Sequence, residues 1–234
     1  MRDVYGNVSD KKSFAVRYPK TSLLADTEII DWIPSDSSAV AFWDQINVST
    51  DIAKTDARIN KGFQGWMIGS KNTTWDAKSP QGPYLFKEVE GDFTMEARIA
   101  DVSGLTASTR TSNEVGIKIQ SATHATDYIT HTVLTGWNVG NLGRSVSKNQ
   151  HVEIKNGKGL QFEPYLQIQK VGEKIYLRTS RNGRDWHNLP NSPFVREDFK
   201  GQKLKVGIYQ LSGNNQYGYG LVHGVKIWSY KYAE

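Results

Sequence analysis

The chain of 234 residues contains no cysteine. This absence excludes disulfides, thiolate catalysis and cysteine-bound zinc, and it leaves the redox compartment open. No run of about 18 apolar residues occurs, so no segment is expected to span a membrane. The first six residues, MRDVYG, lack the apolar core of a secretory signal. We therefore expect either that the protein is not exported by that route or that a signal has been removed from it. A cell-surface or extracellular location follows if a signal was removed, and a virion is the alternative location.

The sequence also has only a small excess of positive over negative charge. The 29 basic and 24 acidic residues give a net charge of +5 and are mixed throughout the chain. Nucleic-acid-binding proteins usually gather lysine and arginine on one face or stretch. We therefore expect no nucleic-acid partner.

What the sequence does contain is a series of short alternating segments. Apolar and polar residues alternate over residues 93–99, 115–120, 165–170, 174–179, 203–210 and 225–230, as in half-buried strands. Asn182-Gly183 and the glycine of Val171-Gly172-Glu173 mark hairpin turns between such segments. No stretch shows a sustained helical period. The pattern predicts an all-β sandwich of two antiparallel sheets over residues 34–234. The less regular residues 1–33 are expected to form an N-terminal arm or extension, with an ordinary first strand as the alternative.

Six segments resemble, in the same order, a family of concanavalin A-like domains of poorly known function. They are residues 82–94 (GPYLFKEVEGDFT), 115–119 (VGIKI), 165–170 (YLQIQK), 180–186 (SRNGRDW), 205–209 (KVGIY) and 225–228 (VKIW). Members are often appended to bacterial glycoside hydrolases of the β-xylosidase type and also occur alone. The resemblance covers about residues 38–230 and implies a concanavalin A-like jelly roll and contact with carbohydrate. No hydrolase is attached here, and residues 1–33 have no counterpart.

Paired carboxylates are the first candidates for catalysis, because glycosidases use two of them. Glu90, Asp92 and Glu96 have even spacing, but Gly91-Asp92 is typical of a turn, and Glu96 lies too far along the chain. Neither a Gly-x-Ser-x-Gly motif nor a grouping of the five histidines indicates a nucleophilic triad. We expect no catalytic residue and hence no enzyme, with a glycoside hydrolase as a minor alternative.

Metal ligands are sparse as well. His124 and His131 are separated by a loop and part of a strand, with no obvious acidic neighbour. The sequence therefore predicts no catalytic metal and no cofactor. A structural calcium ion in a loop stays open and has no assigned position.

The candidate ligand contacts are aromatic and amide side chains. Five of them lie in polar, glycine-rich segments, where a ring can stack on a sugar: Trp75, Trp137, Asn138, Tyr217 and Tyr219. Trp186 and Trp228, at the end of a strand and within one, are expected in the core instead.

A polar sheet face supplies the second group of candidate contacts. If Ile117, Ile119, Leu166, Ile168, Ile175 and Leu177 point inward, the residues between them share the opposite faces of their strands. These residues are Lys118, Gln120, Gln167, Gln169, Tyr176 and Arg178. Amide and guanidinium groups suit hydroxyls and carboxylates, although a solvated sheet face is the alternative.

Together these features favour a lectin-like binding module that recognises a glycan, a polysaccharide or a surface. The alternative is a structural or decoration protein of a larger assembly, such as the capsid or tail of a virion. In that case the apolar residues of segment 1–33 would dock on a protein partner, namely Leu23, Leu24, Ile29, Ile30, Trp32 and Ile33.

Overall fold

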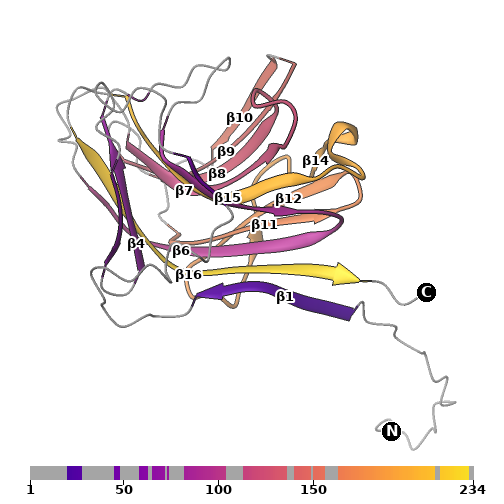
Figure 1. Ribbon diagram of the computed structural model, residues 1–234, viewed down its shortest axis with the longest axis horizontal. Helices are drawn as coiled ribbons and strands as arrows, with labels where there is room; N and C mark the ends of the chain where they lie inside the picture. The colour runs from indigo at the N-terminus through magenta and orange to yellow at the C-terminus, as the bar shows by residue number, and fades with distance from the viewer. Residues whose placement is uncertain are drawn as a thin grey trace, which may run out of the picture.

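The computed structural model describes residues 20–27, 45–47, 58–62, 65–71, 73, 82–103, 113–135, 140–148, 150–155, 163–213 and 217–231. These residues form two sheets that lie one above the other, with β8 and β9 in one layer and β6, β16 and β1 in the other (Figure 1). The 3₁₀ helix η1 (Glu197–Phe199) is the one helical element of the described residues. The predicted all-β jelly-roll sandwich is confirmed.

The first sheet has nine strands. Their order is β13-β12-β11-β6-β16-β4-β3, and β1 and β14 pair in addition with β16 and β12. The strands are β1 (Lys20–Thr27), β3 (Arg58–Gly62), β4 (Gly65–Ser70), β6 (Phe93–Ser103), β11 (Tyr165–Val171), β12 (Lys174–Ser180), β13 (His187–Asn188), β14 (Phe194–Val195) and β16 (Gly218–Lys231).

The second sheet has seven strands in the order β10-β9-β8-β7-β15-β5-β2. They are β2 (Gln45–Asn47), β5 (Tyr84–Val89), β7 (Asn113–Ser121), β8 (Tyr128–Thr135), β9 (Gly140–Ser147), β10 (Gln150–Lys155) and β15 (Leu204–Ser212). Among the described residues, no helix is long and apolar enough to cross a membrane.

The core lies between the sheets and is built by the alternation seen in the sequence. The six residues expected to point inward are fully buried in it: Ile117, Ile119, Leu166, Ile168, Ile175 and Leu177. Because successive side chains of a strand point to opposite faces, each sheet also has an outer face that is turned away from the other sheet.

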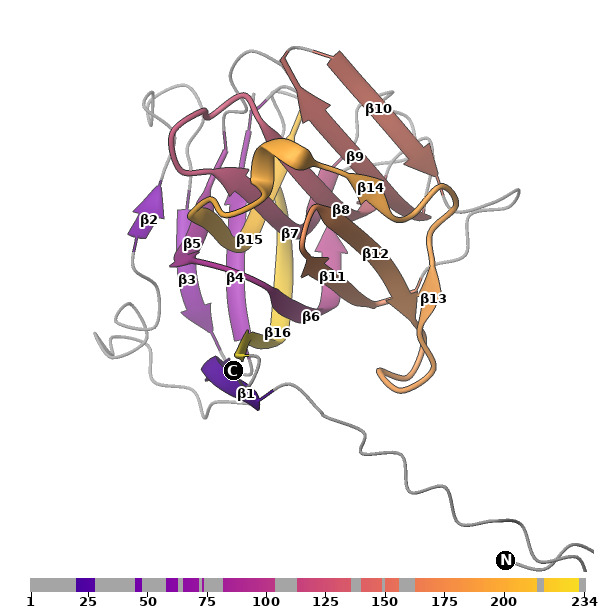
Figure 2. The ribbon, with the colours of Figure 1, turned by 90° about the vertical axis from the view of Figure 1, so that its right-hand side faces the viewer.

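The two predicted hairpins are confirmed. Gly172 has φ +59° in the turn between β11 and β12, where Val171 pairs with Lys174. The Asn182-Gly183 turn joins β12 to β13 with Thr179 opposite His187, and it projects beyond the sheet (Figure 2). Of residues 1–33 the structure describes only β1, which pairs antiparallel with β16. The boundary between an arm and a domain stays a prediction.

Candidate functional site

A pocket of about 510 Å³ opens on the outer face of the first sheet. Strands β6, β11 and β16 form its floor, and the turn after β12 forms one wall. It is lined by Glu96, Ala97, Arg98, Tyr165, Asn182, Gly183, Arg184, His223, Gly224 and Lys226. A concave site with a few convergent polar groups is the usual form of a small-ligand site.

Strand register brings the floor of this pocket together. Arg98 of β6 lies opposite Tyr165 of β11 on one side and opposite His223 of β16 on the other. The register of β16 on β6 shifts between His223 and Lys226, and Gly224 has φ +52° there. Such a bulge re-aims side chains, so β16 contributes both His223 and Lys226 to one pocket.

The wall of the pocket is a tightly hydrogen-bonded turn. The Asn182 side-chain oxygen accepts hydrogen bonds from the backbone N–H of Arg184 at 2.8 Å and of Asp185 at 3.0 Å. The Ser180 hydroxyl oxygen accepts one from the N–H of Gly183 at 2.9 Å. Gly183 has φ +72°, and a Cβ atom there would lie 3.0 Å from the Tyr165 ring. Glycine therefore lets the turn rest against the ring and hold it in place.

Glu96 is fixed by a chain of hydrogen bonds that we call the polar row: Glu96, Gln167, Arg178 and Asn188. The Gln167 amide donates to the Glu96 carboxylate at 2.7 Å and accepts from Arg178 at 2.6 Å. Arg178 in turn donates to the Asn188 side-chain oxygen at 3.0 Å. Burial raises the pKa of Glu96, while the Gln167 hydrogen bond and the charge of Lys226 lower it by less.

His223 offers an unused polar atom. Its side chain is 8% exposed, and its Nε2 is buried without a hydrogen-bond partner. Burial and the nearby Arg98 charge lower the pKa of His223. The imidazole is therefore neutral near pH 7, where Nε2 can either donate to or accept from a ligand hydroxyl, depending on the tautomer.

The four sheet residues predicted as ligand contacts lie beside the pocket. Gln167 and Arg178 belong to the polar row, where their polar groups bind neighbouring side chains. Gln169 donates to the Tyr230 hydroxyl at 3.4 Å, and the Arg178 guanidinium lies 5.0 Å from the Tyr176 ring centroid. These contacts indicate that Gln167 and Arg178 orient Glu96.

The expectation that Lys118 and Gln120 share this face is wrong. Both lie on β7 of the second sheet, buried on its outer face at 5% and 8% exposure. Alternation along a strand predicts which residues face outward, but it does not assign the strand to one sheet or the other.

Of the predicted loop aromatics, Tyr217 and Tyr219 do not line the pocket. Tyr219 pairs with Ser103, five residues along β6 from Arg98, a separation of roughly 16 Å. Tyr217 packs its ring over Gly69 of β4. Trp75, Trp137 and Asn138 lie outside the described residues.

The prediction that Trp186 and Trp228 are core residues is wrong. Both are half-buried and neither belongs to the core. Trp228 follows the core residue Ile227 on β16, so alternation turns its side chain to the outer face of the first sheet.

The carboxylates weighed for catalysis are separated by the fold. Gly91 has φ +75° in the turn before β6, as expected, and Asp92 accepts hydrogen bonds from Lys170 Nζ at 3.3 Å and from the Gly172 N–H at 2.8 Å. Glu90 is exposed and lies 3.7 Å from Lys203. Of the three candidates, only Glu96 lines the pocket.

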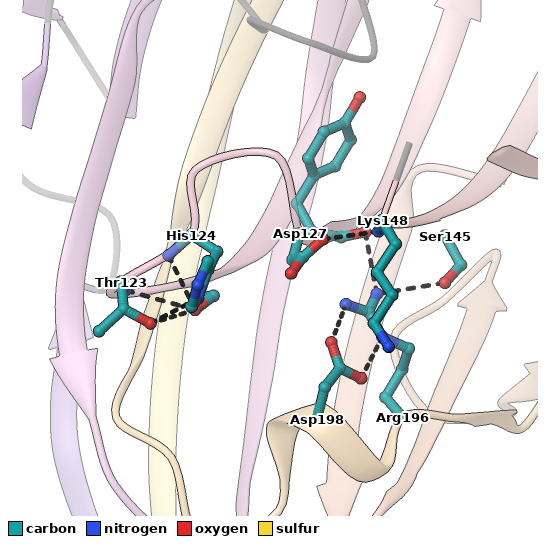
Figure 3. A network of polar contacts seen from close by, with 9 residues as sticks. Thr123, His124, Asp127, Ser145, Lys148, Arg196 and Asp198 are labelled. Atoms are coloured by element: carbon teal, nitrogen blue, oxygen red, sulfur yellow. Dashed lines mark hydrogen bonds and ion pairs between the residues drawn. The ribbon is translucent and has the colours of Figure 1, made fainter. Parts of the chain in front are cut away.

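A second cavity, of about 430 Å³, lies by Lys148, Glu197 and Asp198. One of its lining residues, Asp198, belongs to a network of polar contacts with Arg196 (Figure 3). Arg196 forms two hydrogen bonds of 2.8 and 2.7 Å to the Asp198 carboxylate and donates to Ser145 at 3.3 Å. The Arg196 hydrogen bond lowers the pKa of Asp198. This network ties η1 to the second sheet and offers less to a ligand than the first pocket.

The two histidines considered as metal ligands, His124 and His131, differ in burial and in their hydrogen bonds. His131 is fully buried, and its Nε2 donates to the Arg178 carbonyl oxygen of the other sheet at 2.9 Å. Burial lowers the pKa of His131 to about 4. His124 is exposed and hydrogen-bonds Thr123 at 2.8 Å. Within the described residues, no group of three or more potential ligands could hold a metal ion.

No protein-family model matches the sequence, and no curated protein matches it either. Among solved structures, the fold is similar to that of SCLam, a non-specific endo-β-1,3(4)-glucanase of family GH16. The TM-score is 0.56 at 10% identity, over 91% of this chain and 94% of that one. A functionally unknown protein of Saccharomyces cerevisiae gives 0.53 at 13% identity, over 79% and 100% of the two chains. The alginate lyase of Klebsiella pneumoniae gives 0.51 at 12% identity, over 83% and 93%. These likenesses show the concanavalin A-like fold, while membership of the particular family suggested by the sequence stays a prediction.

The comparison contradicts the expectation that the chain is not an enzyme. That expectation rested on the absence of a familiar spacing of catalytic residues. Structures with the same sandwich nevertheless include a glucanase and a lyase. A missing motif is therefore no ground for excluding catalysis on this fold.

Proposed function

We propose that the protein recognises a carbohydrate in the pocket on the outer face of the first sheet. One observation carries this proposal: the half-exposed ring of Tyr165 lines the same cavity as His223, whose buried Nε2 has no hydrogen-bond partner. An aromatic ring offers a flat apolar surface to the C–H face of a sugar. A buried nitrogen without a partner gains a hydrogen bond when a hydroxyl reaches it.

The geometry around these two groups supports the same function. The turn wall holds the ring of Tyr165 through Gly183, and Gln167 holds Glu96. A site whose side chains are already oriented loses less conformational freedom when it binds. Glu96 adds a carboxylate that can accept hydrogen bonds from hydroxyls.

The test is a glycan array followed by calorimetry on the hits. Tyr165→Ala is expected to abolish binding, and His223→Phe to weaken it about tenfold through the loss of one hydrogen bond. Tyr176→Ala is the matched control, because Tyr176 lies on the same sheet face beside the polar row and outside the pocket lining. Loss of binding in the Tyr176 variant with retention in the Tyr165 variant would refute the assignment of the site to the pocket.

A further inference from the structure

The turn that forms the wall of the pocket contains an Asn-Gly pair, Asn182-Gly183. In such a pair the backbone nitrogen of the glycine can attack the side-chain carbonyl carbon of the asparagine, because glycine has no side chain to hinder the approach. The new N–C bond closes a succinimide ring, the C–N bond of the amide breaks, and the glycine proton leaves with ammonia. Water then opens the ring to aspartate or isoaspartate. Asn182 is exposed, so water reaches it from solvent.

The folded turn prepares the carbon that is attacked. The side-chain oxygen of Asn182 accepts hydrogen bonds from three donors, namely the N–H of Arg184 at 2.8 Å, the N–H of Asp185 at 3.0 Å and the hydroxyl of Ser180 at 3.1 Å. Donors aimed at a carbonyl oxygen stabilise the negative charge that the oxygen gains when its carbon is attacked. The turn therefore makes the amide of Asn182 more reactive.

The attacking nitrogen, by contrast, is restrained. The Gly183 N–H donates to the hydroxyl oxygen of Ser180 at 2.9 Å, and Ser180 is fully buried. The nitrogen becomes a nucleophile only after it loses this proton, and a hydroxyl accepts the hydrogen bond without taking the proton. Attack on Asn182 therefore requires the bond between Gly183 and Ser180 to open first.

We propose that Asn182 is a site of spontaneous deamidation and that Ser180 protects it. While the Gly183 N–H is bonded to Ser180, the amide persists. When that hydrogen bond opens, the polarised carbon is attacked. The reaction consumes only water and releases only ammonia, so the folded chain sets its rate alone.

The product changes the wall of the pocket. Isoaspartate runs the backbone through the former side chain, so the N–H groups of Arg184 and Asp185 lose the oxygen that they now share. Gly183 then no longer holds the turn against the Tyr165 ring. Resting on the carbohydrate function proposed above, this conversion weakens sugar binding and gives the site a limited lifetime.

The first experiment follows the conversion by mass spectrometry during storage of the purified protein in mildly alkaline buffer. The digest keeps residues 180–186 in one peptide, because a second Asn-Gly pair, Asn156-Gly157, must be counted separately. Asn182 is expected to convert about tenfold more slowly in the folded parent than in the urea-unfolded chain, the effect of one retained hydrogen bond. Ser180→Ala, shown to be folded by tryptophan fluorescence, should convert about tenfold faster than the parent.

A matched control lies in the same turn. Asp185→Ala removes the carboxylate that accepts a 2.8 Å hydrogen bond from the Asn182 amide nitrogen, and it leaves the Gly183 bond to Ser180 in place. Its rate should stay close to that of the parent. Equal acceleration in the two variants, or none in Ser180→Ala, overturns the protective role of Ser180. Amide hydrogen exchange at Gly183 of the parent needs no variant: slow exchange supports that role, and exchange as fast as in the unfolded chain overturns it.

Sugar binding is a separate measurement. The converted protein carries one more negative charge, so ion exchange separates it from the parent, and both forms are applied to the same glycan array. Signals of the converted form are expected to be about tenfold lower, whereas Asn182→Asp, which adds the charge and keeps the backbone, should match the parent. Equal signals from the converted form, or an equal loss in Asn182→Asp, overturn the effect of the altered backbone on the wall. If the parent binds no glycan, the carbohydrate function fails, while the conversion rates still decide whether Ser180 protects Asn182.

Discussion

Replacing Lys118 by methionine is expected to stabilise the protein at neutral and acidic pH. Lys118 lies on the outer face of the second sheet and is 5% exposed. Its ammonium group lies 4.6 Å from the ring centroid of Tyr84 and 4.9 Å from that of Tyr128. Burial, with a smaller contribution from the charge of Lys205, lowers its pKa from 10.5 to about 7.

The size and the sign of the effect follow from the two pKa values. A pKa difference of one unit corresponds to about 1.4 kcal/mol. The pKa of Lys118 is 10.5 in the unfolded chain and about 7 in the folded one, so the charged form destabilises the folded protein by up to about 5 kcal/mol. Below pH 7 the group is protonated in both states and this destabilisation is complete. Between pH 7 and 10.5 the unfolded chain binds one more proton, so stability rises by about 1.4 kcal/mol per pH unit. Above 10.5 the destabilisation is gone.

Lys118→Met removes this titration and also the two cation–π contacts, each worth about 0.5–2 kcal/mol. The variant should therefore be about 1–4 kcal/mol more stable than the parent at pH 6. The gain should vanish or reverse near pH 10.5. Urea unfolding followed by tryptophan fluorescence, at pH values from 6 to 10, measures the free energy of unfolding of both proteins.

The difference between the two stability curves is the informative quantity, because every other group titrates in both proteins. Lys205→Met is the control: loss of the neighbouring charge should raise the pKa of Lys118 and shift the lower edge of the window to higher pH. Parallel curves for the parent and Lys118→Met between pH 7 and 10 would refute the reasoning.

Three further changes can be measured by the same unfolding assay. Gly183→Ala should lower the free energy of unfolding by about 1–2 kcal/mol because of its positive φ, and by a further amount because the new Cβ would lie 3.0 Å from the Tyr165 ring. Gly172→Ala is the control for the backbone effect alone, since a Cβ there has nothing within 4 Å. Equal losses of stability in the two variants would argue against the ring contact. Arg144→Met should cost about 3–5 kcal/mol, because it removes the guanidinium that binds Glu114 at 2.5 and 2.8 Å; combining it with Glu114→Leu should restore most of the loss, and an unrescued double variant would contradict this account. Deleting residues 1–33 should lower the free energy of unfolding by a few kcal/mol, because β1 is removed from the sheet and each backbone hydrogen bond contributes about 1 kcal/mol net. An unchanged urea midpoint would show that β1 contributes nothing to stability.

The deletion also bears on the predicted assembly function of residues 1–33, which stays a prediction. Because β1 pairs with β16 over Lys20–Thr27, removing the whole segment would confuse loss of a sheet strand with loss of a docking arm. A deletion that ends before Lys20 keeps both β1 and the apolar residues from Leu23 onward, so it serves as the control for the loss of the remaining N-terminal residues.

Local pattern was enough to predict the strands, the two hairpins and the inward residues such as Ile117 and Leu166. It was not enough for the pocket, because Arg98 meets His223 only through the register between β6 and β16, more than a hundred residues apart. The Gly224 bulge that adds Lys226 to the same site is likewise a product of pairing. Lys118 was placed with Gln167 because their strands have the same period, although they lie in different sheets.

The pairing of β1 with β16 places Lys20 opposite Lys231, so the first and last described strands run side by side at one edge of the molecule (Figure 2). Domains whose ends lie close together tolerate circular permutation and insertion into a loop of another protein. A short linker across this edge, with new ends opened in an exposed turn such as that of Gly172, should therefore leave both sheets intact. The same arrangement would let the sandwich be grafted into a host protein as a branch, with its pocket still open to solvent.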